Sequence, residues 1–406
     1  MGRTQRIRSV VSAAVSLAVT LLILLAACGG GGGGPQEQAP TPTDGLMELM
    51  AYVPTGYEQY WVCMSSQRRF LDDAGFQDVR TTDQLEAALS SQSLSAKDRD
   101  ALLLVPAYVP SAFTRRWAMG TYKVREFLGL DFLQIEDYVS VGQDVFSVAR
   151  LTFDGGALAA ALEAQGYGRE EHGGVPYYSI ADDFDVATPA NGDNLPEGLA
   201  LVMMSSMNRV WLQDGVLAVA PATQAMTDVM DATSGRMESV LDRKDYRRTA
   251  EGLGPVHAVC FLDPAQVSFE ALLHDIDPSM EPYLMEEVQK YPQWATLEPP
   301  DLVALAYYRR PDATDVFKVG LWYNDKEKAK SNAPELQKRL EQYQSSSADK
   351  PLCEGVEVHS QSSSDGSLAL AECRDGLASR WVGQLYNNEQ NIFLIESPAD
   401  YQEVPP

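Results

Sequence analysis

The stretch VFSVARLTFDGGALAAALEAQG, residues 145–166, sets the pattern from which the rest of the fold can be read. Its first part, Val145–Phe153, is rich in β-branched and aromatic side chains and predicts a strand. An alanine-rich segment over 155–165 comes next and predicts a helix. An aspartate stands before this segment and a glycine after it, as is typical of helix ends. Leu158 and Leu162 are four residues apart, so they lie on the same face of that helix. The stretch therefore predicts a strand followed by a helix that packs through its leucines.

Further elements extend this pattern through the first half of the chain. Residues 170–172, Glu-Glu-His, are expected in an exposed Gly-rich turn, and Val175–Ile180 predicts a strand. Asp214-Gly215 predicts a tight turn between two more short strands. Thr223 is expected to cap a helix over 223–235. The buried face of that helix is expected to consist of Met226, Val229 and Met230.

The second half repeats this order with different residues. Val316–Tyr323, VFKVGLWY, predicts a strand, and a helical region follows from Asn324 to Tyr343. Pro334 is expected to break that region because proline has no N–H to donate. The remaining expected elements are a hairpin of Val356–Ser360 with Leu368–Ala371, a helix over Asp375–Asn387 and a closing strand over Asn391–Glu396, to which His257–Leu262 corresponds in the first half.

Both halves thus follow the order strand, helix, strand, strand, helix, strand. Strands joined by tight hairpins pair antiparallel, so the predicted class is α+β. We expect two similar units of antiparallel sheet with helices packed on one face, preceded by a signal peptide and a disordered tether. The expected segments are a signal peptide (1–27), a lipidated cysteine with a Gly/Pro-rich tether (28–45), a first α+β unit with an N-terminal extension (46–263), a helical connector (264–300) and a second α+β unit (301–406).

The N-terminal region ends an apolar run with Leu25-Ala26-Ala27-Cys28, behind three arginines. A basic start, an apolar segment and small residues before a cleavage point are the parts of an export signal. This pattern resembles the lipobox of bacterial lipoproteins. The resemblance implies that a signal peptidase recognises Leu25, Ala26 and Ala27, that Cys28 becomes the first mature residue, and that its thiol and amine receive acyl chains such as palmitate. The protein is then expected on the extracytoplasmic side of a membrane, at the outer surface or in the periplasm.

Two other interpretations of this region stay open: a transmembrane anchor, and an ordinary cleaved signal in which Cys28 is an incidental thiol. The apolar run approaches the roughly 17–25 residues that can span a bilayer. The segment 29–45 that follows contains six consecutive glycines and no basic cluster, which argues against a stop-transfer anchor. As a flexible coil, this tether would reach about 20–25 Å.

The charge of the chain restricts its partners. The formal net charge is −25, from 57 acidic and 32 basic residues. Such a field repels nucleic acid and anionic headgroups. The expected partners are therefore the bilayer, through acylated Cys28, and either a protein of the cell envelope or a small ligand, with no nucleic acid.

Four cysteines remain beside Cys28, and disulfides form readily outside the cytoplasm. Four cysteines allow three pairings, among which sequence alone does not choose. The predicted hairpin near residue 360 is flanked by Cys353 and Cys373, which favours their pairing and leaves Cys63 with Cys260. Four free buried thiols are the alternative.

No catalytic, metal-binding or cofactor-binding arrangement emerges from the sequence. Ser347–Lys350 fits the S-x-x-K outline of serine acyl-enzymes, but it lies in a Ser-rich loop before a proline. The acidic loop 182–193 offers oxygen ligands for calcium without the EF-hand spacing, and a solvated loop is the simpler interpretation. The loop's carboxylates are Asp182, Asp183, Asp185 and Asp193. The four histidines are widely spaced and expected to be structural where they fall in strands: His172, His257, His274 and His359.

Residues 153–178, FDGGALAAALEAQGYGREEHGGVPYY, resemble a segment of uncharacterised exported bacterial lipoproteins. That resemblance implies the α+β architecture and no activity. Adjacent aromatics point to opposite faces of their strands, so one of each pair is expected in the core and the other exposed, in Tyr177-Tyr178, Tyr307-Tyr308 and Trp322-Tyr323. The exposed partners are candidates to line a groove, and packing in the core and on the sheet surface is the alternative. We therefore expect a non-enzymatic, membrane-anchored protein that presents a binding surface. The alternatives are a solute-binding lipoprotein of an ABC importer and, after it, an exported hydrolase.

Overall fold

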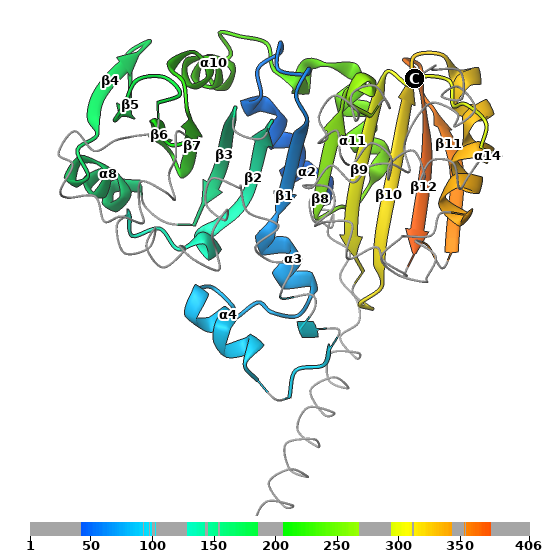
Figure 1. Cartoon of the computed structure of the whole chain (residues 1–406), viewed down its shortest axis with the longest axis horizontal. Helices are drawn as coiled ribbons and strands as arrows, with labels where there is room; N and C mark the ends of the chain where they lie inside the picture. The colour runs from blue at the N-terminus through cyan, green and yellow to red at the C-terminus, as the bar shows by residue number, and fades with distance from the viewer. Residues whose placement is uncertain are drawn as a thin grey trace, which may run out of the picture. The chain divides into compact units, whose positions relative to one another are not determined.

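Twelve strands of the described chain form one sheet, in the order β11-β12-β10-β9-β8-β1-β2-β3-β7-β6-β5-β4 (Figure 1). Every pairing of neighbouring strands is antiparallel. Residues 40–406 form one compact unit. The computed structural model describes residues 42–91, 93–96, 98–99, 102, 128–142, 145–152, 155–185, 206–267, 294–310, 312–342, 353 and 355–374.

The strands are short in the first half and longer in the second. They are β1 Val62–Ser66, β2 Ile135–Val141, β3 Phe146–Leu151, β4 Gly168–His172, β5 Val175–Ser179, β6 Arg209–Gln213, β7 Val216–Ala220, β8 Ala258–Leu262, β9 Leu302–Arg309, β10 Asp315–Tyr323, β11 Gly355–Ser362 and β12 Ser367–Arg374. The α-helices are α2 Pro42–Leu49, α3 Gln67–Asp73, α4 Thr82–Leu89, α8 Gly155–Ala164, α10 Thr223–Thr233, α11 Lys244–Leu253 and α14 Lys326–Gln342. Short 3₁₀ turns lie at Met50–Tyr52, Phe132–Gln134, Val240–Asp242 and Pro264–Val267.

The helices and the antiparallel sheet confirm the α+β class, but the strands form one sheet where two were expected. The two halves are joined by β1 and β8, which pair antiparallel with Cys63 opposite Cys260. An unpaired strand edge leaves N–H and C=O groups without partners, and pairing β1 with β8 satisfies both edges at once. The inner edge strands of the two halves, β1 and β8, are therefore paired with each other.

Helices cover both faces of this sheet, so the expectation of helices on one face is wrong. On one face, α2, α10 and α11 pack against side chains such as Val148, Ala218 and Phe261. On the other face, α3, α4 and α8 pack over the first half and α14 over the second. The cause lies in the strands: all five residues of β1 and all five of β8 are buried. Strands that are apolar at successive positions need cover on both sides.

The expectation for the adjacent aromatics holds in part. Trp322 and Tyr323 are both buried, 2% and 0% exposed, on opposite faces of β10. Tyr178 is half-buried and packs against one core while Tyr177 packs in the other. Tyr307 is buried and Tyr308 half-buried, so only Trp322-Tyr323 departs from the expected pattern of one buried and one more exposed residue.

Most predicted elements are present, with three local corrections. Residues 170–172 belong to β4, and the turn is Gly173-Gly174. The N-cap of α10 is Ala222, so Thr223 is the first helical residue. Helix α14 runs through Pro334 without a break, because its buried residues continue on both sides of the proline. The expected elements over 375–396 lie outside the described residues, as does most of the connector over 264–300.

Both predicted disulfides are present. Cys63 and Cys260 are joined across the β1–β8 pair, with Cα atoms 4.0 Å apart. Cys353, just before β11, is joined to Cys373 at the end of β12, with Cα atoms 5.2 Å apart. All four cysteines are buried.

Candidate functional site

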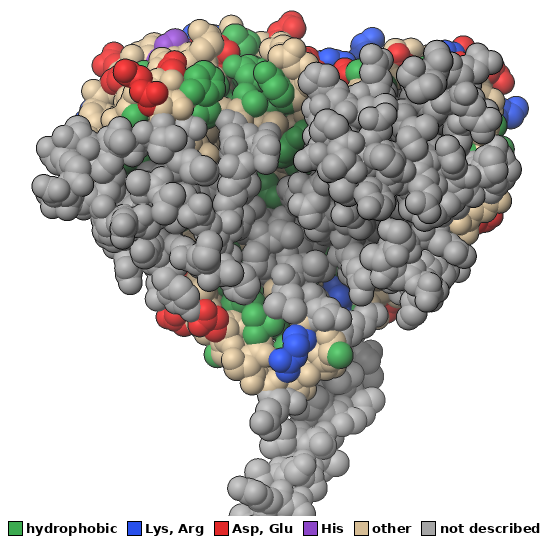
Figure 2. All heavy atoms as spheres, viewed as in Figure 1, with side chains coloured by type: hydrophobic (Ala, Val, Ile, Leu, Met, Phe, Trp, Pro, Cys, Tyr) green, Lys and Arg blue, Asp and Glu red, His purple; other side chains and the backbone are tan. Residues whose placement is uncertain are grey.

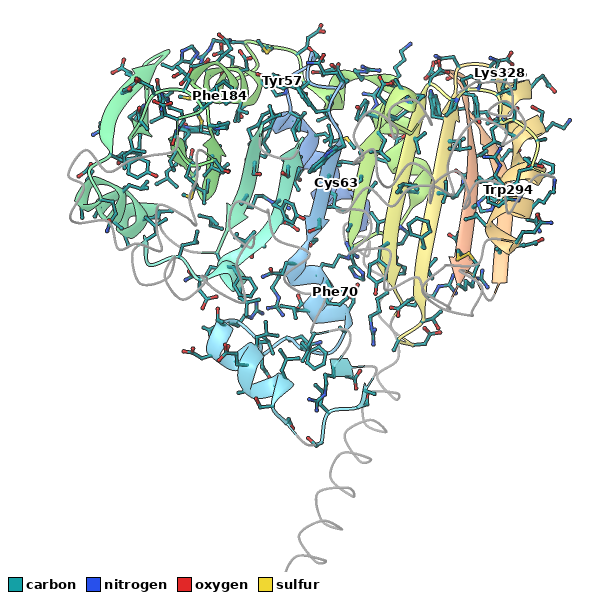
Figure 3. All side chains as sticks on the ribbon, in the orientation of Figure 1. Tyr57, Cys63, Phe70, Phe184, Trp294 and Lys328 are labelled. Carbon is teal, nitrogen blue, oxygen red and sulfur yellow. A yellow bond between two sulfur atoms is a disulfide. The ribbon has the colours of Figure 1, made fainter. Side chains whose placement is uncertain are left out.

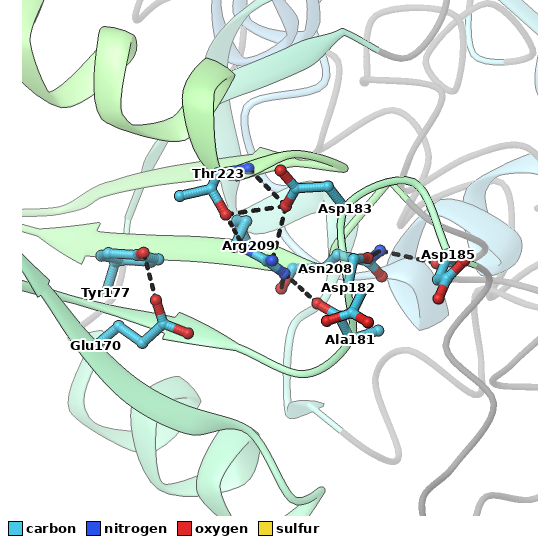
Figure 4. A network of polar contacts seen from close by, with 9 residues as sticks. All are labelled: Glu170, Tyr177, Ala181, Asp182, Asp183, Asp185, Asn208, Arg209 and Thr223. Carbon is cyan, nitrogen blue, oxygen red and sulfur yellow. Dashed lines mark hydrogen bonds and ion pairs between the residues drawn. The ribbon is translucent and has the colours of Figure 1, made fainter.

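The loop Ala181–Asp185, directly after β5, is held in place by side chains of β6 and α10 (Figure 4). The guanidinium of Arg209 donates to the Ala181 carbonyl at 2.5 Å and to the Asp183 carboxylate at 2.7 Å. The same carboxylate accepts from the backbone N–H and the hydroxyl of Thr223, both at 2.9 Å. Asp183 thus takes the place of the N-terminal cap that the sequence assigned to Thr223 itself.

Two further contacts fix the backbone of this loop. The Asn208 side-chain amide donates to the carbonyls of Asp182 and Asp185, at 2.9 and 2.8 Å. The N–H of Phe184 donates to the Pro221 carbonyl at 3.0 Å. Asn208 is fully buried, so these bonds are shielded from water. These bonds tie the loop backbone to the residues beside β6 and α10.

That conformation presents Phe184 to solvent. Its φ is 62°, a value that bulky L-residues rarely adopt, and the residue is 69% exposed. Only Phe184 and Tyr60 are exposed large hydrophobic residues in the described part of the chain. Backbone strain of this kind persists where surrounding contacts hold it, as the Arg209 and Asn208 contacts do here. The loop thus holds an aromatic ring outside the core.

The second exposed aromatic residue, Tyr60, lies beside Tyr57, which contacts α10. Its ring centroid is 6.3 Å from that of Tyr57, which packs edge-on to Phe146 at 5.3 Å. The Tyr57 hydroxyl donates to Asp228 of α10 at 2.8 Å. Burial, reinforced by Asp228, raises the pKa of Tyr57 well above its ordinary value, so this hydroxyl stays protonated. Tyr60 is therefore supported by a ring that is tied to α10.

Helix α10 joins these two aromatic positions. Figure 3 places Phe184 and Tyr57 close to it at one end of the molecule, and Figure 2 shows hydrophobic side chains at the surface there. We call this region the α10 surface. It consists of Tyr57, Tyr60, Asp182, Phe184, Asp185, Gln224 and Asp228.

The α10 surface is acidic. Asp182 and Asp185 flank Phe184 and are exposed. The neighbouring arginines are already neutralised: Arg209 by Asp183, and Arg243 by Asp245 and by Glu58, the last at 3.0 Å. The unpaired charge around the aromatic residues is therefore negative.

Comparison of this chain with protein-family models, with curated proteins and with solved structures found no match. The function must therefore be inferred from the geometry of the chain itself.

The calcium interpretation of the acidic loop gains no support from the described residues. Asp183 already accepts three hydrogen bonds on one carboxylate oxygen, and two loop carbonyls accept from Asn208. In the described ranges, no group of three or more His, Cys, Asp or Glu is placed to hold a metal ion. Asp193 lies outside those ranges. One carboxylate oxygen of Asp183 and the carbonyls of Asp182 and Asp185 are thus already bound to N–H and O–H donors.

His257 is the most enclosed ionisable group that the sequence singled out. Its ring is 0% exposed, Nε2 lies 2.8 Å from an Asp73 carboxylate oxygen, and Nδ1 accepts from the Arg309 N–H at 3.0 Å. Burial lowers the pKa of His257, so the ring is neutral and donates from Nε2. Both ring nitrogens are occupied, which leaves neither to act as a general base.

Lys318 is the other buried group with reactive chemistry. Its ammonium donates to the Leu253 carbonyl at 2.6 Å and lies 3.3 Å from Glu372. Leu253 ends α11, where a positive charge complements the helix dipole. Burial lowers the pKa of Lys318. The amine binds a helix end, so its role is structural.

The other predicted residues have simpler outcomes. His172 contacts Asp231 at 2.9 Å near the surface, and His359 is exposed on β11. Leu25, Ala26, Ala27, Cys28, His274 and Ser347–Lys350 lie outside the described residues. No helix in the described ranges has both the length and the apolarity to cross a bilayer. The sequence analysis missed Phe184 and Tyr60, whose only signal is an apolar residue within a polar, turn-forming segment.

Proposed function

We propose that this chain is a lipid-anchored, extracytoplasmic lipoprotein that works by binding and not by catalysis. The observation that carries the proposal is the pairing of the cysteines. Of five cysteines, four form two disulfides within the body, and the fifth is Cys28 of the lipobox pattern. Disulfides are rare in cytosolic proteins, so both features support export.

The anchor follows from the same reading. Cleavage after Leu25-Ala26-Ala27 would leave Cys28 at the new N-terminus, free to carry two or three acyl chains. More than one chain is needed for stable anchoring, because a single chain binds a bilayer only marginally. Residues 42–45 of the expected tether belong to α2, so the proposed tether is the stretch before Pro42, and it would let the body stand off the bilayer.

The proposal of a binding role rests on how the candidate groups are used. His257, Lys318 and Asp183 all hold other parts of the fold through hydrogen bonds. Exposed aromatic side chains on a fixed loop suit recognition instead. An importer's solute-binding protein is built from strand–helix–strand units with parallel sheets, whereas the described strand pairs are all antiparallel.

We also propose that the two halves are structural repeats, related across the β1–β8 pair. The order β1-β2-β3-β7-β6 in the first half corresponds to β8-β9-β10-β12-β11 in the second. Helices α8 and α14 follow β3 and β10, and both pack on the same face of the sheet. The correspondence supports the two-unit reading within one continuous sheet.

The test is lipid attachment to Cys28. Cells expressing the full chain are fed an alkyne analogue of palmitate, and the protein is followed by fluorescent labelling and membrane fractionation. We expect label and membrane association for the natural chain, and loss of both in Cys28→Ala. The matched control, Cys353→Ala with Cys373→Ala, should keep the label. A mature N-terminal peptide without lipid mass would overturn the anchoring proposal.

A further inference from the structure

We propose that the α10 surface binds a basic protein segment that carries an apolar side chain. This inference rests on the proposed function, because it names the partner of the binding surface. The segment's apolar side chain would contact Phe184 and Tyr60, and its cationic side chains would lie against the acidic residues around them.

The aromatic side chains of this surface are held before any partner arrives. Phe184 is fixed by hydrogen bonds from Arg209 and Asn208 to its loop and by its own N–H bond to Pro221. Tyr60 stacks beside Tyr57, whose hydroxyl is bound to α10. A rigid aromatic anchor loses little conformational entropy on binding, which is why such side chains dominate interface energies.

The charge selects the partner. Asp182 and Asp185 are exposed in the loop that carries Phe184, and Asp228 accepts from the Tyr57 hydroxyl beside Tyr60. The nearby Arg209 and Arg243 are paired with carboxylates. The whole chain carries −25. This field attracts cationic segments and repels nucleic acid, anionic headgroups and acidic proteins. Charge complementarity therefore specifies Lys or Arg next to the apolar side chain.

The experiment measures binding of defined peptides to the full chain in detergent micelles. Three fluorescent peptides are compared by anisotropy: alternating Lys and Leu, alternating Glu and Leu, and alternating Lys and Ser. We expect the Lys–Leu peptide to bind most tightly, because only it offers both charge and apolar contact. Binding should weaken between low and physiological ionic strength.

The decisive variant is Phe184→Gly. Glycine accepts the φ of 62° without strain, so this change should leave the fold intact while removing the ring. We expect Lys–Leu binding to weaken about tenfold or more in Phe184→Gly and in Tyr60→Ser. The control Lys326→Ala, at an exposed position on α14, should bind as the natural chain does. Thermal unfolding of each variant checks that the fold is kept.

A second pair of variants tests the charge. Asp182→Asn with Asp185→Asn keeps the backbone carbonyls that Asn208 binds, so it changes charge alone. We expect weaker Lys–Leu binding and a smaller salt dependence. Equal binding of all three peptides, or unchanged binding in folded Phe184→Gly, would overturn the inference. Peptide binding is measured on the folded chain, whether or not Cys28 carries lipid. A negative binding result would therefore overturn the inferred partner without bearing on the proposed lipid anchor.

Discussion

Removing the Cys63–Cys260 disulfide should destabilise the protein more than removing Cys353–Cys373. The two disulfides close loops of sequence separation 197 and 20. In the chain-entropy model, a cross-link stabilises by restricting the unfolded chain, and the effect grows with the logarithm of loop length. This gives about 5 kcal/mol for Cys63–Cys260 and about 3 kcal/mol for Cys353–Cys373. All four cysteines are buried, so replacement by alanine leaves a small cavity in both cases. The difference of about 2 kcal/mol between the pairs is therefore the firmer number.

The assay is equilibrium unfolding in urea, followed by tryptophan fluorescence, for Cys63→Ala/Cys260→Ala and Cys353→Ala/Cys373→Ala. Both variants should unfold at lower urea concentration. Cys63→Ala/Cys260→Ala should also show the larger increase in the slope of unfolding free energy against urea concentration. The reason is that loss of the longer loop lets the unfolded chain expand more and expose more surface. Equal losses, or a larger loss for Cys353→Ala/Cys373→Ala, would show that loop entropy does not set the stabilities.

Three other predictions concern stability. Burial lowers the pKa of His257, so this histidine binds a proton more readily in the unfolded chain than in the folded protein. The urea midpoint should therefore fall as the pH drops below 6.5. The fall should be less steep in His257→Gln. Lys318→Met should cost about 1–3 kcal/mol of unfolding free energy, because a buried helix-end carbonyl loses its donor, whereas Lys326→Met at an exposed position should cost nothing measurable. Gly366→Ala should lower the thermal midpoint and cost about 1–3 kcal/mol of unfolding free energy, because the added methyl group would overlap a tryptophan ring and a carbonyl. Gly355→Ala, where the added methyl group meets open space, should leave the midpoint unchanged.

Local patterns predicted the elements of this fold better than their assembly. Strand β10 and the hairpin of β11 and β12 follow from residues adjacent in sequence, and they lie within a residue or two of the predicted bounds at most ends. The β1–β8 pair joins Cys63 to Cys260 over a sequence separation of 197 residues, and no local periodicity encodes such a contact. The burial of both sheet faces was visible in runs such as AVCFL at Ala258–Leu262, but hairpins led us to expect one open face.

The candidate site was predictable only in part. The acidic loop after β5 stood out by composition, and its spacing does not fit an EF-hand. Its actual organisation depends on Arg209, Asn208 and Thr223, which are far from Asp183 in sequence. The left-handed backbone of Phe184 depends on those tertiary contacts, and residue type alone argues against it. Sequence patterns therefore located the loop but did not predict that it exposes an aromatic side chain.

The proposed repeat would also explain why the proposed binding surface lies in one half only. Between α8 and β6, residues 165–208 include β4, β5 and the loop with Phe184. At the corresponding place in the second half, only residues 343–354 separate α14 from β11. The strands that the two halves share form the common sheet. The additional hairpin of the first half, β4 and β5, leads into the loop with Phe184. A surface that serves recognition is expected where one repeat differs from the other, because the shared elements are already committed to packing. Grafting a connection as short as 343–354 in place of 165–208 should thus abolish Lys–Leu peptide binding, and binding that survived it would place the recognition surface elsewhere.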